Sequence, residues 1–171
     1  MANRKTYKES CQVLKDQQLL EGDAVPELPA RSPRYDDEQL GVSFFRTQLT
    51  DAQLEGLTLP RTFFGRSEIH GVSFRSTNLS QSTACWNDFV DVDFGDADLT
   101  GASIFHRVNF RGAILRGADL RRTSFTGCTF ADADVTSAKL SRSLLWFFRL
   151  SYAQRRSIDW QSDHGPEPEG G

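Results

Sequence analysis

The sequence is poor in the residues from which catalytic, redox and metal sites are built. Its 171 residues include only three cysteines, three histidines and one methionine. Cys11, Cys85 and Cys128 are an odd set without C-x-x-C spacing, so we expect reduced thiols rather than a disulfide framework or a zinc site. The histidines show no ligand-like spacing with Cys, Asp or Glu. Because nucleophile motifs and phosphate-binding loops are also missing, the sequence predicts no enzymatic activity and no cofactor or metal.

Long apolar runs and an excess of basic charge are missing as well. The longest apolar run, residues 144–148, is far shorter than the roughly 20 residues of a membrane-spanning helix. The basic N-terminus is not followed by the apolar stretch of a secretory signal, so a cytoplasmic location is expected. The formal net charge is -3 at pH 7, which argues against direct nucleic-acid binding, because nucleic-acid-binding domains are usually basic.

What the sequence does contain is an internal repeat of five residues. Large apolar residues recur at every fifth position from Phe44 to Ile104, with Ala84 as the exception. After one inserted residue the series resumes at Phe110 and continues to Leu145. The residue two positions before each of these is usually small. This period matches neither the roughly 3.6 residues of an amphipathic helix nor the roughly 2.0 of a flat strand.

The tightest copies of the repeat are residues 97–101, Ala-Asp-Leu-Thr-Gly, and residues 118–122, Ala-Asp-Leu-Arg-Arg. They resemble the A-(D/N)-L-x-x consensus of the pentapeptide-repeat family, and the resemblance covers roughly residues 42 to 145. The resemblance implies an all-β solenoid, a right-handed quadrilateral β-helix in which four pentapeptides make one coil. Twenty-residue coils then stack one column of leucines, which is Leu59, Leu79, Leu99, Leu120 and Leu140.

This register survives the insertion only if a single residue bulges between Ile104 and Phe110, at His106 and Arg107. We expect Cys85 or a displaced backbone to fill the gap at Ala84, because empty volume is costly in a close-packed interior. About five coils at the ~4.8 Å strand spacing predict a rod roughly 25 Å long.

The repeat divides the chain into four parts, since both ends of a solenoid need caps. They are an N-terminal cap at residues 1–41 with a short helix and a Pro-containing linker, the β-helix at 42–145, a C-terminal cap with a short helix at 146–163, and a disordered tail at 164–171. Tyr7, Cys11 and Leu14 form one helical stripe in the first cap. Leu14 and Leu19 are also in phase with the repeat, so an extra irregular coil stays open.

Five large apolar residues follow the last repeat and exceed what one coil end obviously needs. They are Trp146, Phe147, Phe148, Leu150 and Ile158. One interpretation is a cap on the last coil, with a short helix that Ser151 begins. The alternative is a homodimer through the C-terminal end, as the family resemblance implies for some members.

Because Leu, Phe and small residues fill the interior, the sequence places function on the outer faces. Acidic residues predominate on the second and third sides of the coils, and basic residues on the first and fourth. Asp93, Asp98, Asp119 and Asp134 precede central residues, where they can bond turn backbone. The remaining acidic candidates for partner binding are Asp51, Glu55, Asp88, Asp91 and Asp96.

One corner has an unusual composition. Arg46, Arg66, Trp86 and Arg107 stack in one column, which places an indole between guanidinium groups and predicts a cation-π ladder. Exposed Trp beside Arg is the residue mixture enriched at binding hot spots. A tryptophan folded over the Ala84 gap, with solvated arginines around it, explains the same pattern.

The sequence thus predicts a non-enzymatic module that binds another protein, of the immunity or antitoxin type, through its outer faces. The alternative, which rests on the family resemblance, is a DNA mimic that binds DNA gyrase or another topoisomerase and protects it from quinolones or toxins. The divided charge argues against the alternative, because a duplex presents one negative charge per ~1.7 Å along its whole length.

Overall fold

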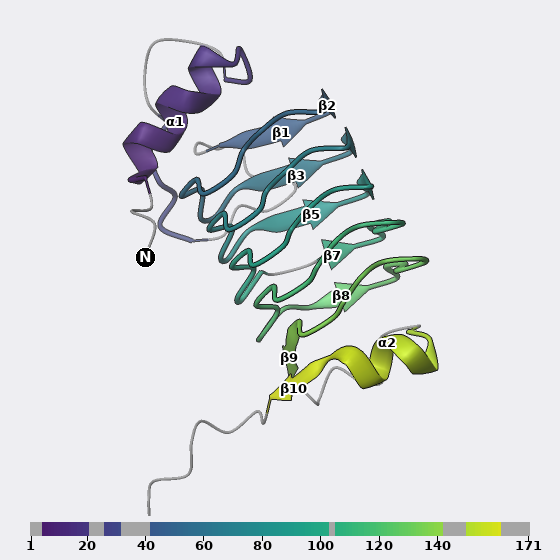
Figure 1. Ribbon diagram of the computed structural model, residues 1–171. Coiled ribbons are helices and arrows are strands. Elements are labelled where there is room, and N and C mark those ends of the chain that lie inside the picture. The colour runs from purple at the N-terminus through teal and green to yellow at the C-terminus, as the bar shows by residue number, and fades with distance from the viewer. Residues whose placement is uncertain (1–4, 21–25, 32–41, 103–104, 142–149, 162–171) are drawn as a thin grey trace, which may run out of the picture.

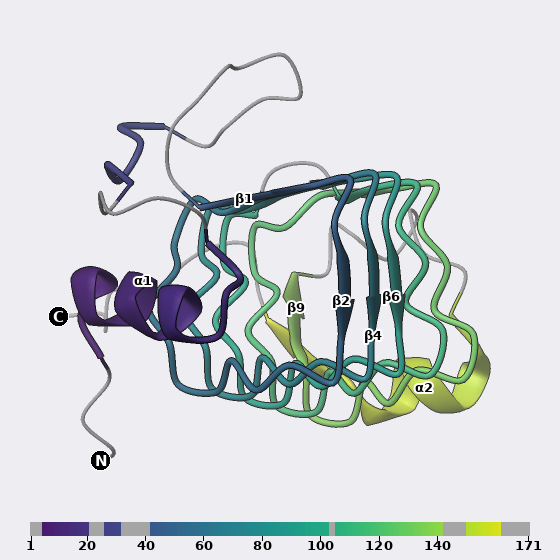
Figure 2. The same cartoon turned by 90° about the horizontal axis from the view of Figure 1, so that it is seen from above.

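The chain folds into a four-sided β-solenoid whose coils stack along one axis (Figure 1). The computed structural model describes residues 5–20, 26–31, 42–102, 105–141 and 150–161, and of Phe105 only the backbone. The square outline of each coil is clear when the rod is viewed along its axis (Figure 2). The prediction of a right-handed quadrilateral β-helix of about five coils is confirmed.

The four sides of each coil, called sides 1 to 4 in chain order, stack in parallel. Side 1 forms the sheet β1 (Ser43–Phe45), β3 (Phe63–Gly65), β5 (Thr83–Cys85), β7 (Phe105–His106) and β8 (Phe125–Thr126). Side 2 forms the sheet β2 (Gln48–Thr50), β4 (Glu68–His70) and β6 (Asp88–Val90). Side 3 is held by single bridges such as Gln53 to Ser73, and side 4 by bridges such as Thr58 to Asn78 and by β9 (Lys139–Ser141).

The chain turns between sides through residues with a left-handed backbone, which form four corner columns. Corner 1 consists of Arg46, Arg66, Trp86, Arg107 and Gly127, with φ between 50° and 66°. Corner 2 consists of Asp51, Gly71, Asp91, Gly112 and Asp132, with φ between 54° and 67°. Corner 3 consists of Gly56, Ser76, Asp96, Gly117 and Ser137, with φ between 56° and 69°. Because this conformation is strained for most residues, each coil depends on the backbone bonds of its neighbours, such as the bond from the Arg46 N–H to the Gly65 C=O.

The inserted residue lies earlier than the sequence predicts. Ala84 pairs with Phe105 rather than Ile104, so the extra residue precedes Phe105, and Ile104 lies outside the described residues. The expected bulge at His106 and Arg107 is therefore wrong. Pairing through Phe105 places His106 on the outer face of β7 and keeps Arg107 in corner 1, where its N–H donates to the Thr126 C=O. An insertion at the corner would have broken this column.

Stacked aromatic rings and leucines fill the interior. Phe74 and Phe94 stack with centroids 5.4 Å apart, and Phe110 and Phe130 stack at 4.9 Å. The predicted leucine column is confirmed, because the bridges Asn78 to Asp98, Asp98 to Asp119 and Asp119 to Lys139 align its members, all of which are buried.

The expectation for the gap at Ala84 is wrong. Cys85 follows Ala84 in β5 and therefore points to the outer face, and β5 keeps a regular register. Instead, the ring of Phe64, which is in register with Ala84, meets the ring of Phe89 edge to face at 5.5 Å.

Helix α1 (Tyr7–Asp16) covers the first coil, and it includes Leu14, one of the two residues on which the alternative of an extra coil rested. Thr6 begins the helix with a capping box, and Cys11 and Leu14 are fully buried against the core. The Ser10 hydroxyl accepts a hydrogen bond from the Thr58 N–H at 2.8 Å, and the Gln17 amide donates to the Gln53 C=O at 3.2 Å. Helix α1 therefore satisfies open backbone groups of sides 3 and 4.

The last coil ends with helix α2 (Tyr152–Ser157) and strand β10 (Asp159–Gln161). The Gln154 amide donates to the Phe130 and Ala133 carbonyls, at 3.0 and 2.9 Å, which satisfies the open edge of that coil. Strand β10 pairs with β9 so that Trp160 extends the leucine column beyond Leu140. The sequence pattern did not predict this extension. Neither α1 nor α2, the helices of the described ranges, has the length and apolar character to cross a lipid bilayer.

Candidate functional site

Corner 1 carries an exposed aromatic and basic cluster. The Arg66 guanidinium lies 5.6 Å from the centre of the Trp86 ring, which confirms one contact of the predicted cation-π ladder. The ring of His106 meets the other flank of the indole, with centroids 5.6 Å apart and planes at 87°. Trp86 remains 41% exposed, which rules out an indole folded over the core. Arg107 continues the column as an exposed side chain.

A second aromatic residue enlarges this cluster and is absent from the candidates drawn from the sequence. Phe45 is 43% exposed and lies beneath the Arg46 guanidinium, which is 5.2 Å from the ring centre. Its ring stacks on Phe63 of the next coil at 6.3 Å. The sequence held a usable signal, because a residue directly after a central position points outward from the strand. We name Phe45, Arg46, Arg66, Trp86, His106 and Arg107 the corner 1 cluster.

The acidic candidates are spread over corners 2 and 3 and the sides beside them, and several have partners. Asp96 at corner 3 forms an ion pair with Arg75 at 3.5 Å. Asp88 accepts a hydrogen bond from the Asn109 amide at 3.1 Å, and Glu55 accepts one from the Ser73 hydroxyl at 2.8 Å. Asp51 and Asp91, both at corner 2, form no ion pair with any described residue.

Glycines separate the carboxylates of corner 2. The carboxylate of Asp51 occupies the place where a Cβ on Gly71 would lie, and Asp91 does the same above Gly112. Acid therefore recurs only in alternate coils, about 9.6 Å apart at the usual strand spacing, which limits repulsion along the column.

The prediction that four aspartates bond turn backbone is confirmed. Asp93, Asp98, Asp119 and Asp134 each accept a hydrogen bond from the N–H two residues later, at 2.7 to 3.2 Å. Hydrogen bonds from Thr136 lower the pKa of Asp134. Burial alone would raise the pKa of Asp119, but bonds and charge from Arg121 outweigh it and lower the pKa. These acids therefore serve the turns and are poor candidates for partner binding.

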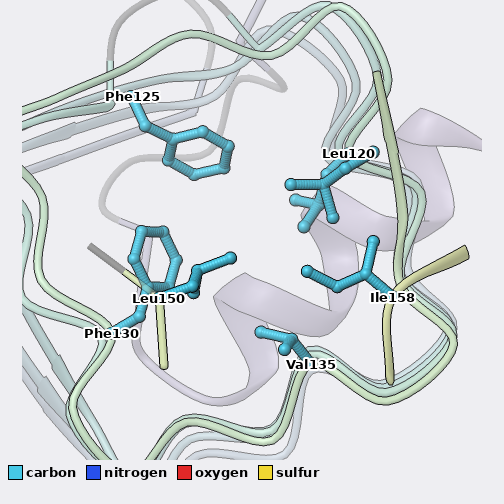
Figure 3. Close-up of a pocket in the computed structure, with 7 residues that line it drawn as sticks. Leu120, Phe125, Phe130, Val135, Leu150 and Ile158 are labelled. Carbon is cyan, nitrogen blue, oxygen red and sulfur yellow. The ribbon is translucent and has the colours of Figure 1, made fainter. Parts of the chain in front are cut away.

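Two of the five C-terminal apolar candidates lie over the end of the core. Leu150 and Ile158 close an apolar cavity of about 10 Å³ together with Leu120, Phe125, Phe130, Val135 and Leu140 (Figure 3). The described residues of its wall are all apolar and offer a water molecule no hydrogen-bond partner. Trp146, Phe147 and Phe148 lie outside the described residues, so a dimer through this end stays a prediction.

The three cysteines are free thiols with raised pKa values. Burial raises the pKa of Cys11 and Cys85, and it raises that of Cys128 to about 11. Within the described ranges, no three His, Cys, Asp or Glu side chains converge as metal ligands would.

Because the pKa values of these thiols are raised, we expect slow alkylation of the folded protein. At pH 8 roughly a thousandth of Cys128 is thiolate, so its reaction with iodoacetamide should accelerate about tenfold per pH unit toward pH 11. Intact mass spectrometry against time measures this rate, and protein unfolded in urea is the control in which all three thiols react quickly. Rapid modification of the folded protein at pH 8 would contradict the raised pKa of Cys128.

Comparison with known proteins finds a family model and several solved structures that resemble this chain. A family model of pentapeptide repeats matches residues 47–83, 67–104 and 103–142, in 8 copies. No curated protein matches the sequence. Rfr23, a pentapeptide repeat protein from the cyanobacterium Cyanothece 51142, is 17% identical, and its match covers 60% of this chain and 82% of Rfr23 with a TM-score of 0.56.

Two further solved structures resemble the chain more loosely. HetL, a pentapeptide repeat protein involved in heterocyst differentiation regulation in Nostoc sp. strain PCC 7120, is 23% identical over 59% of each chain, with a TM-score of 0.29. QnrB1, a plasmid-mediated fluoroquinolone resistance protein, is 12% identical over 70% of this chain and 81% of its own, with a TM-score of 0.20.

Proposed function

Because the chain belongs to the pentapeptide-repeat family, we propose that it is a non-enzymatic module that captures one partner protein, as an immunity or antitoxin protein does, through the corner 1 cluster. The observation that carries this proposal is the pair of exposed aromatic rings, Phe45 and Trp86, each held beneath an arginine. Arginine and large aromatic residues dominate the energetics of protein interfaces, because they bury large areas and still form polar contacts.

The charge of the cluster indicates the chemistry of the partner. Arg46, Arg66 and Arg107 point outward along one line, and the described chain gives Arg46 and Arg107 no ion pair. An acidic surface on the partner would complement this line and accelerate association. Because the arginines stand on a rigid stack of coils, the backbone loses little conformational entropy on binding.

The second candidate function is an acidic mimic of DNA that binds gyrase. The carboxylates of Asp51, Asp91 and Asp132 along corner 2, which form no ion pair with any residue that the structure describes, favour it. They recur only about every 9.6 Å, much more sparsely than the charges of a duplex, and a basic column flanks the same side of the rod. We therefore rank gyrase binding second.

Affinity capture from a lysate of the native host, followed by binding measurements with the purified partner, tests the proposal. The variant Arg66→Glu/Trp86→Ala should weaken binding at least tenfold, since truncation of a hot-spot residue costs about 2 kcal/mol or more. The matched control Arg111→Glu/Ile114→Ala changes the charge equally and removes another exposed apolar side chain, and it should bind like the wild type.

Two results would overturn the proposal. Equal losses in the test variant and the control would mean that no site at corner 1 exists. Capture of gyrase that is lost in Asp51→Lys/Asp91→Lys and retained in Arg66→Glu/Trp86→Ala would establish mimicry, and a supercoiling assay with purified gyrase and a quinolone would check it independently.

A further inference from the structure

Side 2 is the open face of the rod. Its outward residues before and after each central position are Gln48, Thr50, Glu68, His70, Asp88, Val90, Asn109, Arg111, Thr129 and Ala131, and all are exposed except Val90 and Asn109, which are half-buried. On side 1, by contrast, the outward residues Phe63, Thr83 and Cys85 are buried. The ion pairs between described residues lie on sides 3 and 4 and at corner 3, so no described residue forms an ion pair with the charged side chains of side 2.

The two edges of side 2 carry opposite charges. Corner 1 lines one edge with Arg46 in the first coil and Arg107 in the fourth. Corner 2 lines the other edge with Asp51, Asp91 and Asp132 in the first, third and fifth coils, and glycines leave space between them. A flat face with one basic and one acidic edge is complementary to the same face of a second copy. The second copy must be rotated by a half-turn that brings its acidic edge against the basic edge of the first.

We infer that side 2 binds a second copy of this chain about a two-fold axis parallel to the solenoid axis. This rotation keeps each coil level with its counterpart and exchanges the two edges. Arg46 of one copy then faces Asp51 of the other, and Arg107 faces Gly112, between Asp91 and Asp132. On the face itself, Glu68 of one copy lies opposite His70 of the other. Each contact occurs twice, as an isologous interface requires.

The alternative two-fold axis, across the rod, brings arginine edges against each other and aspartate edges against each other, so it is repulsive. Side 2 measures about 24 Å by 10 Å at ordinary strand dimensions, so the dimer buries less than the ~1,200 Å² typical of stable complexes. The association is therefore weak, dominated by charge, and sensitive to salt.

A charge-swap series followed by sedimentation velocity tests this interface. Arg46→Glu and Asp51→Arg should each weaken self-association at least tenfold, because each replaces two attractive contacts with two repulsive ones. The double variant Arg46→Glu/Asp51→Arg should restore it to within about threefold, and so should an equimolar mixture of the two single variants. Arg75→Glu, on side 3, is the control and should self-associate like the wild type.

Wild-type dimers should dissociate in ~1 M NaCl, where screening acts within about 3 Å. A wild type that is monomeric at low salt and millimolar concentration would overturn the inference. So would a dimer that the single variants leave intact or that high salt strengthens, since that behaviour belongs to an apolar C-terminal interface. Arg66→Glu/Trp86→Ala leaves the Arg46 and Asp51 contact in place, so this test and the partner test can fail independently.

Discussion

Replacement of Phe94 by alanine is expected to lower the free energy of unfolding by about 3 to 5 kcal/mol. Phe94 is 1% exposed, stacks on Phe74 at 5.4 Å, and meets Phe89 and Phe110 edge to face at 5.4 and 6.2 Å. Truncation therefore removes contacts to the coils on both sides. Each coil of a solenoid packs only on its neighbours, so no distant part of the core can compensate.

Urea unfolding followed by circular dichroism measures this loss. Ile114→Ala is the matched control, because Ile114 lies on the same side of the next coil and is 40% exposed. We expect the control to cost less than about 1 kcal/mol. A loss below ~1 kcal/mol for Phe94→Ala would mean that the aromatic stack contributes little to stability, and that the backbone ladder carries the fold.

The repeat region was predictable because its five-residue period has one structural solution. An apolar residue at every fifth position cannot form one face of a helix or a flat strand, whereas a square coil buries all of them. The same register predicted that Arg66 and Trp86 adjoin, and their contact distance bears this out. It also separated the aspartates that bond turns from the others, as the bond from the Gly95 N–H to Asp93 shows.

The position of the inserted residue was not predictable from the pattern. Ile104 and Phe105 are both large and apolar, so either can fill the column below Ala84. The choice depends on which pairing keeps a continuous ladder and an unbroken corner, and those are contacts between coils. Trp160 shows the same limit, since its place beyond Leu140 depends on helix α2 returning the chain to side 4.

The candidate site was only partly predictable, because its neutralising partners lie in other coils. Arg75 reaches from one coil to Asp93 and Asp96 of the next, which reduces the acidity that a count along the sequence assigns to this side. The charges of Asp51 and Asp91 persist because the residues stacked on them, Gly71 and Gly112, have no side chain. A long charged side chain can reach oppositely charged residues in more than one place on the neighbouring coils. The repeat pattern does not determine which of them it contacts.

Replacement of Asn87 by alanine is expected to lower the free energy of unfolding by about 2 to 4 kcal/mol. The loss comes from buried hydrogen bonds rather than from the volume that is removed. Asn87 is 2% exposed, and its amide donates to the Phe64 and Cys85 carbonyls at 3.0 and 3.1 Å. Its carbonyl oxygen accepts a hydrogen bond from the Ser67 N–H at 2.9 Å. Truncation leaves the Ser67 N–H without this acceptor in a site that water does not reach.

The preceding coil supplies the variant that separates hydrogen bonding from packing. Ser67 holds the equivalent position there, where its hydroxyl donates to the Phe44 carbonyl at 2.8 Å and accepts from the Thr47 N–H at 3.1 Å. Asn87→Ser should therefore recover at least ~1 kcal/mol relative to Asn87→Ala, although both remove similar volume. Asn78→Ala, which loses only a half-exposed turn bond to the Ser80 N–H, should cost about 1 kcal/mol or less. Equal unfolding curves for Asn87→Ser and Asn87→Ala would show that this polar column is dispensable, and that apolar packing alone holds side 1 against side 2.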